Sequence, residues 1–275
     1  MTDRHVMECL GMTRVVIEDG QVTEVGTPMI KYCPLFKKYR GINEITPEIV
    51  RENIEFRIKS FGMCTEDRDL RMKDFLSFGI SEILSSALKQ NLIDAAVIAA
   101  DGCGTAVITD PEIVQGLGGR ISGMCFTSPL KNVIDCVGET NIVDIEKTTI
   151  NAIDGTEKAI SLGHSKIAVT VASADDAKHL RETYGKNLLI IAVHTSCTSA
   201  VDAVRMFDLC DIITACASST LREESRRRDI VVAGNKVPVY GVSDAGKDLV
   251  LMRLKEVGKE PWDGTDAEEP PYPLI

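Results

Sequence analysis

Long hydrophobic runs and an excess of positive charge are missing from this chain of 275 residues. Its longest clearly apolar strings, such as 188–193, are far shorter than the roughly 18 residues that a membrane-spanning helix needs. The formal net charge is 31 − 41 = −10, and no basic stretch indicates a nucleic-acid groove. Residues 1–10 carry acids and His5, unlike a secretory signal, which has a basic stretch followed by an apolar one. We therefore expect a cytoplasmic protein that binds neither membranes nor nucleic acid.

Standard cofactor motifs are also missing. Gly116, Gly118 and Gly119 do not form the dinucleotide-binding pattern G-x-G-x-x-G, and no G-x-x-x-x-G-K-[ST] sequence occurs. The nine cysteines include no C-x₂-C pair, which excludes a zinc ribbon or a ferredoxin-type cluster motif. Any ligand site must therefore be assembled by the tertiary structure.

The composition is that of a globular protein, with 44% hydrophobic and 26% charged residues. The chain is long enough for one large α/β domain or one domain with a smaller companion. We expect an N-terminal hairpin and helical region over 1–92, a Rossmann-like α/β core over 93–258 and a Pro-rich acidic tail over 259–275. The tail is expected to be extended, disordered or an arm on a partner.

Local signals define several elements of the N-terminal region. Asp19-Gly20 separates two β-prone runs within 14–26, which predicts a hairpin with a tight type I′ turn. A helix is predicted to begin after Thr46 as N-cap, with Pro47 in its first position, and to end at Gly62. A second helix is predicted over 81–91.

A buried strand is predicted over 95–100, ending in the turn Asp101-Gly102-Cys103-Gly104. After it we expect another strand, a short helix from Pro111 and a glycine-rich loop. From residue 151 onward, strands and helices alternate, which favours a mainly parallel sheet with helices on both faces and strand carboxyl ends along one edge. The expected strands are 166–172, 188–193 and 211–215, and the expected helices are 154–162, 175–184, 199–209 and 244–258.

Hydroxyl side chains gather where these predicted strands end, and this is the edge at which such sheets bind ligands. Backbone N–H groups and hydroxyls at helix N-termini can hold a phosphate or a carboxylate. The same serines and threonines are also ordinary helix caps. The anion-binding candidates are Ser173, Thr195, Ser196, Ser218 and Ser219.

Five cysteines lie in predicted turns or at a strand end, the kind of position that often carries function. Thiolates brought together from separate loops could hold an iron–sulfur cluster or zinc. Cys136 and Cys210, by contrast, lie in apolar helical patterns and are expected in the core. The metal-ligand candidates are Cys33, Cys64, Cys103 and Cys197, with Cys216 in reserve.

A nucleophilic cysteine is the alternative interpretation. Cys197 or Cys103 could act as a thiolate, with His194 near enough in the sequence to serve as a base for Cys197. His194 could equally be a strand-end histidine of structural origin. Asp101 beside Cys103 disfavours an easily formed thiolate there, because a nearby negative charge raises a thiol's pKa.

Several cysteine-bearing and neighbouring strings resemble the methanogenesis marker protein 8 family, described as a domain of unknown function. They are IKYCPLF (30–36), FGMCTEDR (61–68), DFLSFG (74–79) and TDPE (109–112) with the glycines of 116–123. The resemblance implies an archaeal setting beside the machinery of methyl-coenzyme M reductase, and it favours oxygen-sensitive metallocofactor chemistry. It implies no particular reaction and no catalytic residues.

Three functions follow as hypotheses. The first is an accessory protein of methanogenesis that binds an iron–sulfur cluster or another metal and acts in maturation, activation or repair of an enzyme or cofactor. The second is an enzyme that binds an anionic small molecule at the strand ends and uses a cysteine nucleophile. The third is a non-catalytic interaction module. Whether the protein is an enzyme, and which partner or metal it uses, stay open at this point.

Overall fold

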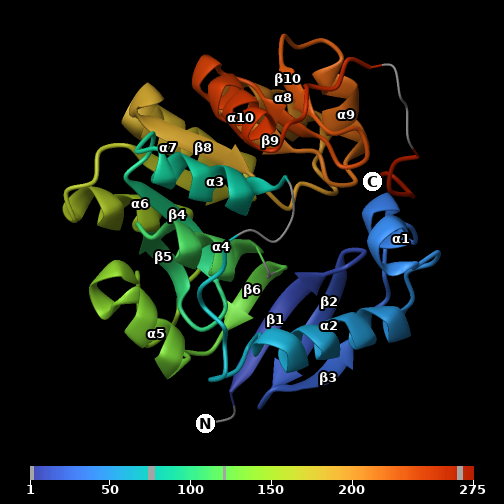
Figure 1. Ribbon diagram of the computed structural model, residues 1–275, viewed down its shortest axis with the longest axis vertical. Helices are drawn as coiled ribbons and strands as arrows, with labels where there is room; N and C mark the ends of the chain where they lie inside the picture. The colour runs from blue at the N-terminus through green and yellow to red at the C-terminus, as the bar shows by residue number, and fades with distance from the viewer. Residues whose placement is uncertain (1–2, 74–77, 120–121, 265–268) are drawn as a thin grey trace. The chain divides into compact units, whose positions relative to one another are not determined.

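The structure is a computed structural model (Figure 1). It describes residues 3–73, 78–119, 122–264 and 269–275. These residues form two compact units: unit 1 is Met1–Met29 with Ile45–Ile167, and unit 2 is Ile30–Glu44 with Ala168–Ile275. The units differ from the expected segments 1–92, 93–258 and 259–275. Residues 30–44, expected in the N-terminal region, belong to unit 2. Residues 74–77 of the string DFLSFG (74–79) lie outside the described residues.

Unit 1 contains an antiparallel sheet in the order β3-β2-β1-β6. The predicted hairpin is confirmed: Asp19 and Gly20 both have positive φ, 48° and 74°, as a type I′ turn requires. The strands are β1 (Arg4–Cys9), β2 (Thr13–Glu18), β3 (Gln21–Val25) and β6 (Gly123–Thr127).

Helix α2 (Pro47–Phe61) confirms the predicted start and end signals. The Thr46 hydroxyl accepts a hydrogen bond from the Ile49 amide at 3.4 Å, and Gly62 ends the helix with φ 68°. A Cβ at Gly62 would lie 2.2 Å from the Asp67 carbonyl oxygen, so the chain can turn back here only with glycine. Val50 and Ile54 are the buried residues of α2, which packs against β3.

Strand β4 (Ala95–Ala100) has the predicted bounds, but it turns back at once into β5 (Gly104–Ile108), its antiparallel partner. Cys103 therefore lies in a hairpin turn and not in a loop that leads to a crossover helix. The expected glycine-rich loop is also wrong, since Gly116, Gly118 and Gly119 belong to helix α4 (Pro111–Gly119). Glycine at 116 allows close packing, because a Cβ there would lie 2.0 Å from the Leu70 carbonyl oxygen.

The other helices of unit 1 cover the β4–β5 pair or pack on one another. Helix α6 contacts both strands, and α3 packs along α4. They are α3 (Ile80–Lys89), α5 (Lys131–Val137), α6 (Ala152–Ser161) and the short 3₁₀ helix η1 (Glu139–Asn141).

In unit 2 the strands follow the order β10-β11-β9-β8-β7. Strands β8 and β9 pair in parallel, whereas β11 is antiparallel to both β9 and β10. Strands β10 and β11 therefore form a hairpin, and the class is mixed α/β. The strands are β7 (Ile167–Val171), β8 (Leu188–Ala192), β9 (Ile212–Thr214), β10 (Val231–Ala233) and β11 (Val239–Gly241).

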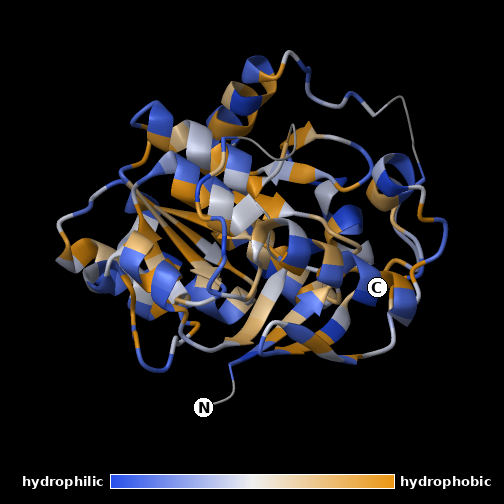
Figure 2. Ribbon diagram, turned by 60° about the horizontal axis from the view of Figure 1, so that its bottom comes forward, coloured by the Kyte–Doolittle hydropathy of each residue, from blue (hydrophilic) through white to orange (hydrophobic). Residues whose placement is uncertain are grey.

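The predicted alternation of helices with these strands is confirmed. Helix α7 packs on β8 and α8, and α10 packs on β10 and β11. Ile190, Ile191 and Ala192 of β8 are fully buried, and Figure 2 shows hydrophobic residues concentrated in the strands. The helices are α1 (Pro34–Arg40), α7 (Ala174–Tyr184), η2 (Gly185–Asn187), α8 (Ala200–Leu209), α9 (Ser219–Ser225) and α10 (Asp244–Glu256). Among the described residues, no helix has the length and apolar character to span a membrane.

The last described residues, 269–275, form a segment held on unit 2, and we name it the C-terminal segment. Tyr272 pairs with Tyr32 in an antiparallel bridge, and their rings stack with centroids 4.8 Å apart. The Ile275 amide donates to the Ala217 carbonyl at 2.9 Å, and the Ile275 carbonyl accepts from the amides of Cys197 and Ser219, each at 3.3 Å. This part of the expected tail therefore lies along the loops that follow β8 and β9.

Candidate functional site

A cavity of about 250 Å³ opens in unit 2 where β7 and β8 end. Its walls come from residues 172–175 after β7, His194 and residues 196–199 after β8, and Asp202 and Met206 of α8. Because the loops that follow both strands line one cavity, the two carboxyl ends lie at the same edge. This is the edge that the sequence pattern indicates as the ligand-binding edge.

Two helices begin at this cavity, and serines cap both of them. The Ser173 hydroxyl accepts from the amides of Asp175 and Asp176 at 3.1 and 3.4 Å. The Ser199 hydroxyl accepts from the Asp202 amide at 3.1 Å. These serines satisfy helix amides that would otherwise have no partner, so their hydroxyl oxygens are already engaged as acceptors.

The charge on the cavity wall is acidic. Asp175 and Asp202 line it, and no Lys or Arg does so among the described residues. Arg205, which lies in α8, forms ion pairs with both carboxylates, at 2.5 Å to Asp175 and 2.8 Å to Asp202. Its hydrogen bond and positive charge lower the pKa of Asp175. Since the guanidinium is committed to these acids, the cavity suits a neutral polar ligand better than an anion.

Cys197 and His194 both line the cavity, and both are exposed to solvent. Each adopts a left-handed backbone conformation, with φ of 62° and 55°, which costs non-glycine residues roughly 1 kcal/mol. Desolvation by surrounding atoms lowers the pKa of His194, although its exposure to solvent limits this effect. A lowered pKa favours the neutral imidazole, the form that can accept a proton.

The remaining hydroxyl candidates mainly join loops to one another. The buried Thr195 hydroxyl bonds to the Thr214 carbonyl, and Ser218 caps α9 by accepting from the Leu221 amide at 3.2 Å. Ser196 accepts from the Ala217 amide at 3.2 Å while also lining the cavity. The Ser219 amide donates to Ile275. Ser173 and Ser196 are thus the two candidates at the cavity, and anion binding by all five stays a prediction.

Cys64 and Cys103 lie in unit 1 and are fully buried around Asp101. The Asp101 carboxylate accepts from the Cys64 amide at 2.7 Å and pairs with the Arg68 guanidinium at 3.0 Å. Burial, and secondly the Asp101 charge, raise the pKa of both thiols above the usual value. Both cysteines are therefore protonated at neutral pH.

The Arg68 side chain is fully satisfied inside unit 1, although it is completely buried. Its other nitrogens donate to the carbonyls of Asp69 at 2.9 Å and Gly116 at 3.0 Å. The guanidinium carbon also lies 5.3 Å from the centre of the Phe61 ring. This arrangement is a structural core that ties residues 61–69 to the turn after β4.

Cys33 and Cys216 lie in unit 2, and both are half-buried. Burial raises the pKa of Cys33. Cys216 also lies 3.6 Å from the Thr214 hydroxyl. Across the part of the chain that the structure describes, no three His, Cys, Asp or Glu side chains gather as a metal ion requires. The five cysteine candidates are not assembled into such a group, and metal binding stays a prediction.

Some cavity residues did not figure among the sequence candidates. Asp175, Thr198, Ser199 and Asp202 lie in the loops after β7 and β8 or in the first turns of α7 and α8, and Met206 lies one turn further along α8. Their position directly after predicted strands was a usable signal. The signal was weak because capping alone accounts for Ser and Asp at helix starts.

Comparison with known proteins places the chain in a family. Residues 5–255 match the family described as an uncharacterized protein conserved in archaea (DUF2099). A protein of Methanocaldococcus jannaschii, itself described as uncharacterized, is 45% identical over 260 residues, which cover 94% of this chain and 92% of the relative. No solved structure matches the chain. The chain therefore belongs to this conserved archaeal family.

Proposed function

We propose that unit 2 binds a small, polar, uncharged molecule in the cavity beyond β7 and β8 and reacts with it through Cys197. One observation carries this proposal: an exposed cysteine and an exposed histidine share the wall of a cavity at a strand-end edge. A thiolate is a strong nucleophile, and a neutral imidazole is the usual base that generates it.

The proposed step is attack on an electrophilic carbon, such as a carbonyl carbon. The Cys197 sulfur forms the new bond to this carbon, and the carbonyl π electron pair moves onto oxygen. His194 accepts the proton that leaves the thiol and can return it to the oxygen or to a leaving group. The Cys197 backbone N–H donates a hydrogen bond to the Ile275 carbonyl oxygen, which fixes the loop that presents the sulfur.

The proposal replaces the anionic substrate expected from the hydroxyl-rich loops with a neutral one. Two carboxylates line the cavity, and Arg205 is already paired with both of them. A further negative charge in the cavity would be repelled by these acids.

Paired alkylation reagents test both parts of the proposal. Iodoacetamide is neutral and iodoacetate is anionic. In each reagent the thiolate sulfur attacks the CH₂ carbon and displaces iodide. The ratio of the iodoacetamide rate to the iodoacetate rate should be about tenfold larger at Cys197 than at Cys125. Cys125 is the reference because it is exposed but lines no described cavity. Asp202→Asn should narrow that preference. Equal preferences at the two cysteines, measured by mass spectrometry of each peptide, would overturn the proposal.

An accessory role in methanogenesis is the second candidate, and the similar protein from Methanocaldococcus jannaschii favours that setting. In this form the chain would hold an iron–sulfur cluster and serve the machinery of methyl-coenzyme M reductase. Among the described residues no three His, Cys, Asp or Glu side chains gather to hold a metal ion, so we derive no step through a cluster. Anaerobic purification with iron and sulfide analysis tests it: matching iron and sulfide, lost in both Cys103→Ser and Cys197→Ser, would favour this candidate over the first.

A further inference from the structure

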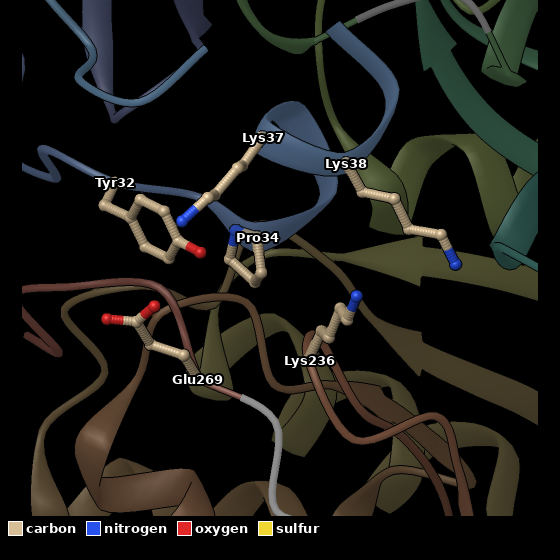
Figure 3. Close-up of a pocket in the computed structure, with 6 residues that line it drawn as sticks. All are labelled: Tyr32, Pro34, Lys37, Lys38, Lys236 and Glu269. Carbon is tan, nitrogen blue, oxygen red and sulfur yellow. The ribbon is translucent and has the colours of Figure 1, made fainter. Parts of the chain in front are cut away.

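A second cavity in unit 2, of about 310 Å³, is lined by side chains that the sequence analysis did not single out. Figure 3 shows the Lys37 ammonium group beside Tyr32 on one side of Pro34, and those of Lys38 and Lys236 on the other side. The lining residues are Tyr32, Pro34, Lys37, Lys38, Lys236 and Glu269, and we name this cavity the lysine pocket.

The cations of the lysine pocket come from two separate parts of unit 2. Lys37 and Lys38 are adjacent residues of α1, while Lys236 lies in the turn between β10 and β11. The Lys37 ammonium nitrogen lies 5.5 Å from the centre of the Tyr32 ring, and that of Lys38 lies 5.3 Å from the Tyr39 ring. Ring contacts of this kind position an ammonium group without replacing the hydrogen bonds it can donate to oxygen.

The charge of this pocket is opposite to that of the whole chain. Three lysines and one acid, Glu269, line it in a chain with net charge −10. The Glu269 carboxylate also engages the Tyr32 hydroxyl in a hydrogen bond. Like charges held around one space repel each other, and this arrangement is favourable when an anion enters between them.

The Tyr32 ring is not available for stacking on a ligand. Tyr272 stacks on it with an interplanar angle of 19°, and Lys37 lies over it as well. A ligand would therefore be recognised through charge and hydrogen bonds, not through an aromatic base. The volume is at the lower end of that of small-molecule sites and far too small for a macromolecule.

We propose that the lysine pocket binds a small molecule with two or more negative charges, carried by phosphate or carboxylate groups. The anion site that the sequence suggests for the hydroxyl-rich loops then lies elsewhere in unit 2, at the lysines. This proposal does not depend on the reactivity of Cys197, since its ligand and its residues are separate from those of the first cavity.

Titration calorimetry with the full chain tests the proposal, using pyrophosphate and citrate as probes of the two anion types and acetate as a single-charge probe. We expect pyrophosphate, citrate or both to bind, with acetate at least about tenfold weaker, because each charge-assisted hydrogen bond adds affinity. ADP should bind no more tightly than pyrophosphate, since the Tyr32 faces are covered.

Variants identify the site. Lys38→Gln and Lys236→Gln should each weaken binding by about tenfold. Lys186→Gln is the matched control, because Lys186 is an exposed lysine of unit 2 outside the pocket, and it should leave affinity unchanged. Unliganded melting temperatures equal to that of the parent protein would show that the variants fold. Failure of both multivalent probes to bind at millimolar concentration, or equal weakening by Lys186→Gln, would overturn the proposal.

Discussion

The two units use their turn cysteines in opposite ways. In unit 1, Cys64 and Cys103 lie in turns, yet both are buried against Asp101 and Arg68. In unit 2, Cys197 also lies in a turn, but its side chain is exposed at a cavity. A turn position therefore does not tell whether a thiol is reactive. The groups around it decide, and in unit 1 these are a buried ion pair and a carboxylate that binds the turn's backbone amide.

The largest expected effect is on the unit 1 cluster. Asp101→Asn removes the charge that compensates the buried Arg68 guanidinium, and we expect a loss of about 3–5 kcal/mol in the free energy of unfolding. Urea denaturation measures it. Asp67→Asn is the control, since Asp67 is exposed in the same segment and should change stability by less than about 0.5 kcal/mol. An Asp101→Asn loss of under about 1 kcal/mol would contradict the structural role.

Thiol labelling sharpens the comparison between the units. Cys64 and Cys103 can react only when unit 1 opens, whereas Cys197 is accessible in the folded state. We expect Cys197 to be alkylated at least about a hundredfold faster than either buried thiol, because local opening of a core costs several kcal/mol. Anaerobic labelling followed by peptide mass spectrometry measures the rates. Similar rates at all three would mean that unit 1 is not closed around Asp101.

Alkaline pH should reveal the buried thiol of Cys9 in β1. Burial raises the pKa of Cys9 to about 12, so the unfolded chain releases this proton at lower pH than the folded chain. The resulting stabilisation is complete below the unfolded pKa of about 8.5 and is lost as pH rises toward 12. Between pH 7 and pH 10 the free energy of unfolding should therefore fall by about 1–2 kcal/mol less in Cys9→Ala than in the parent protein. Urea titrations at the two pH values measure this difference. An unchanged difference would place Cys9 in contact with water.

Helix caps provide the smallest difference. The Ser199 hydroxyl that caps α8 accepts a hydrogen bond from a backbone N–H at 3.1 Å, whereas the Thr46 hydroxyl that caps α2 accepts one at 3.4 Å. Ser199→Ala should cost about 1 kcal/mol, and Thr46→Ala about half of that, since a longer bond contributes less. Thermal unfolding of the two variants gives the ranking, and a larger cost at Thr46 would reverse it.

Local structure was largely predictable from the sequence because its signals are local. Thr46, Pro47 and Gly62 predict α2, and Asp19-Gly20 predicts the β2–β3 turn, since capping and positive φ depend on a few adjacent residues. The alternation of strands and helices in unit 2 follows from hydrophobic periodicity in the same way. His194 and Cys197 could be chosen as candidates because they directly follow a predicted strand.

Pairing and charge compensation could not be predicted, because they join residues far apart in sequence. Arg68 meets Asp101 across 33 positions, and this contact makes a core of the turn that holds Cys103. The antiparallel return of β5 onto β4 depends on the same turn. The lysine pocket joins α1 to a distant hairpin turn, and neither segment carries a motif. The acidic wall of the cavity was missed because Asp175 and Asp202 also suit helix first turns.

The pH dependence of Cys197 alkylation, compared between the parent protein and His194→Asn, tests the central claim most directly. If His194 accepts the thiol proton, the parent rate at pH 7 should exceed that of His194→Asn by about tenfold, and the two rates should converge at pH 10, where hydroxide can take the place of the base. Cys125 should show the same profile in both proteins. Identical profiles for Cys197 in the two proteins would contradict the claim that this histidine and cysteine form one site.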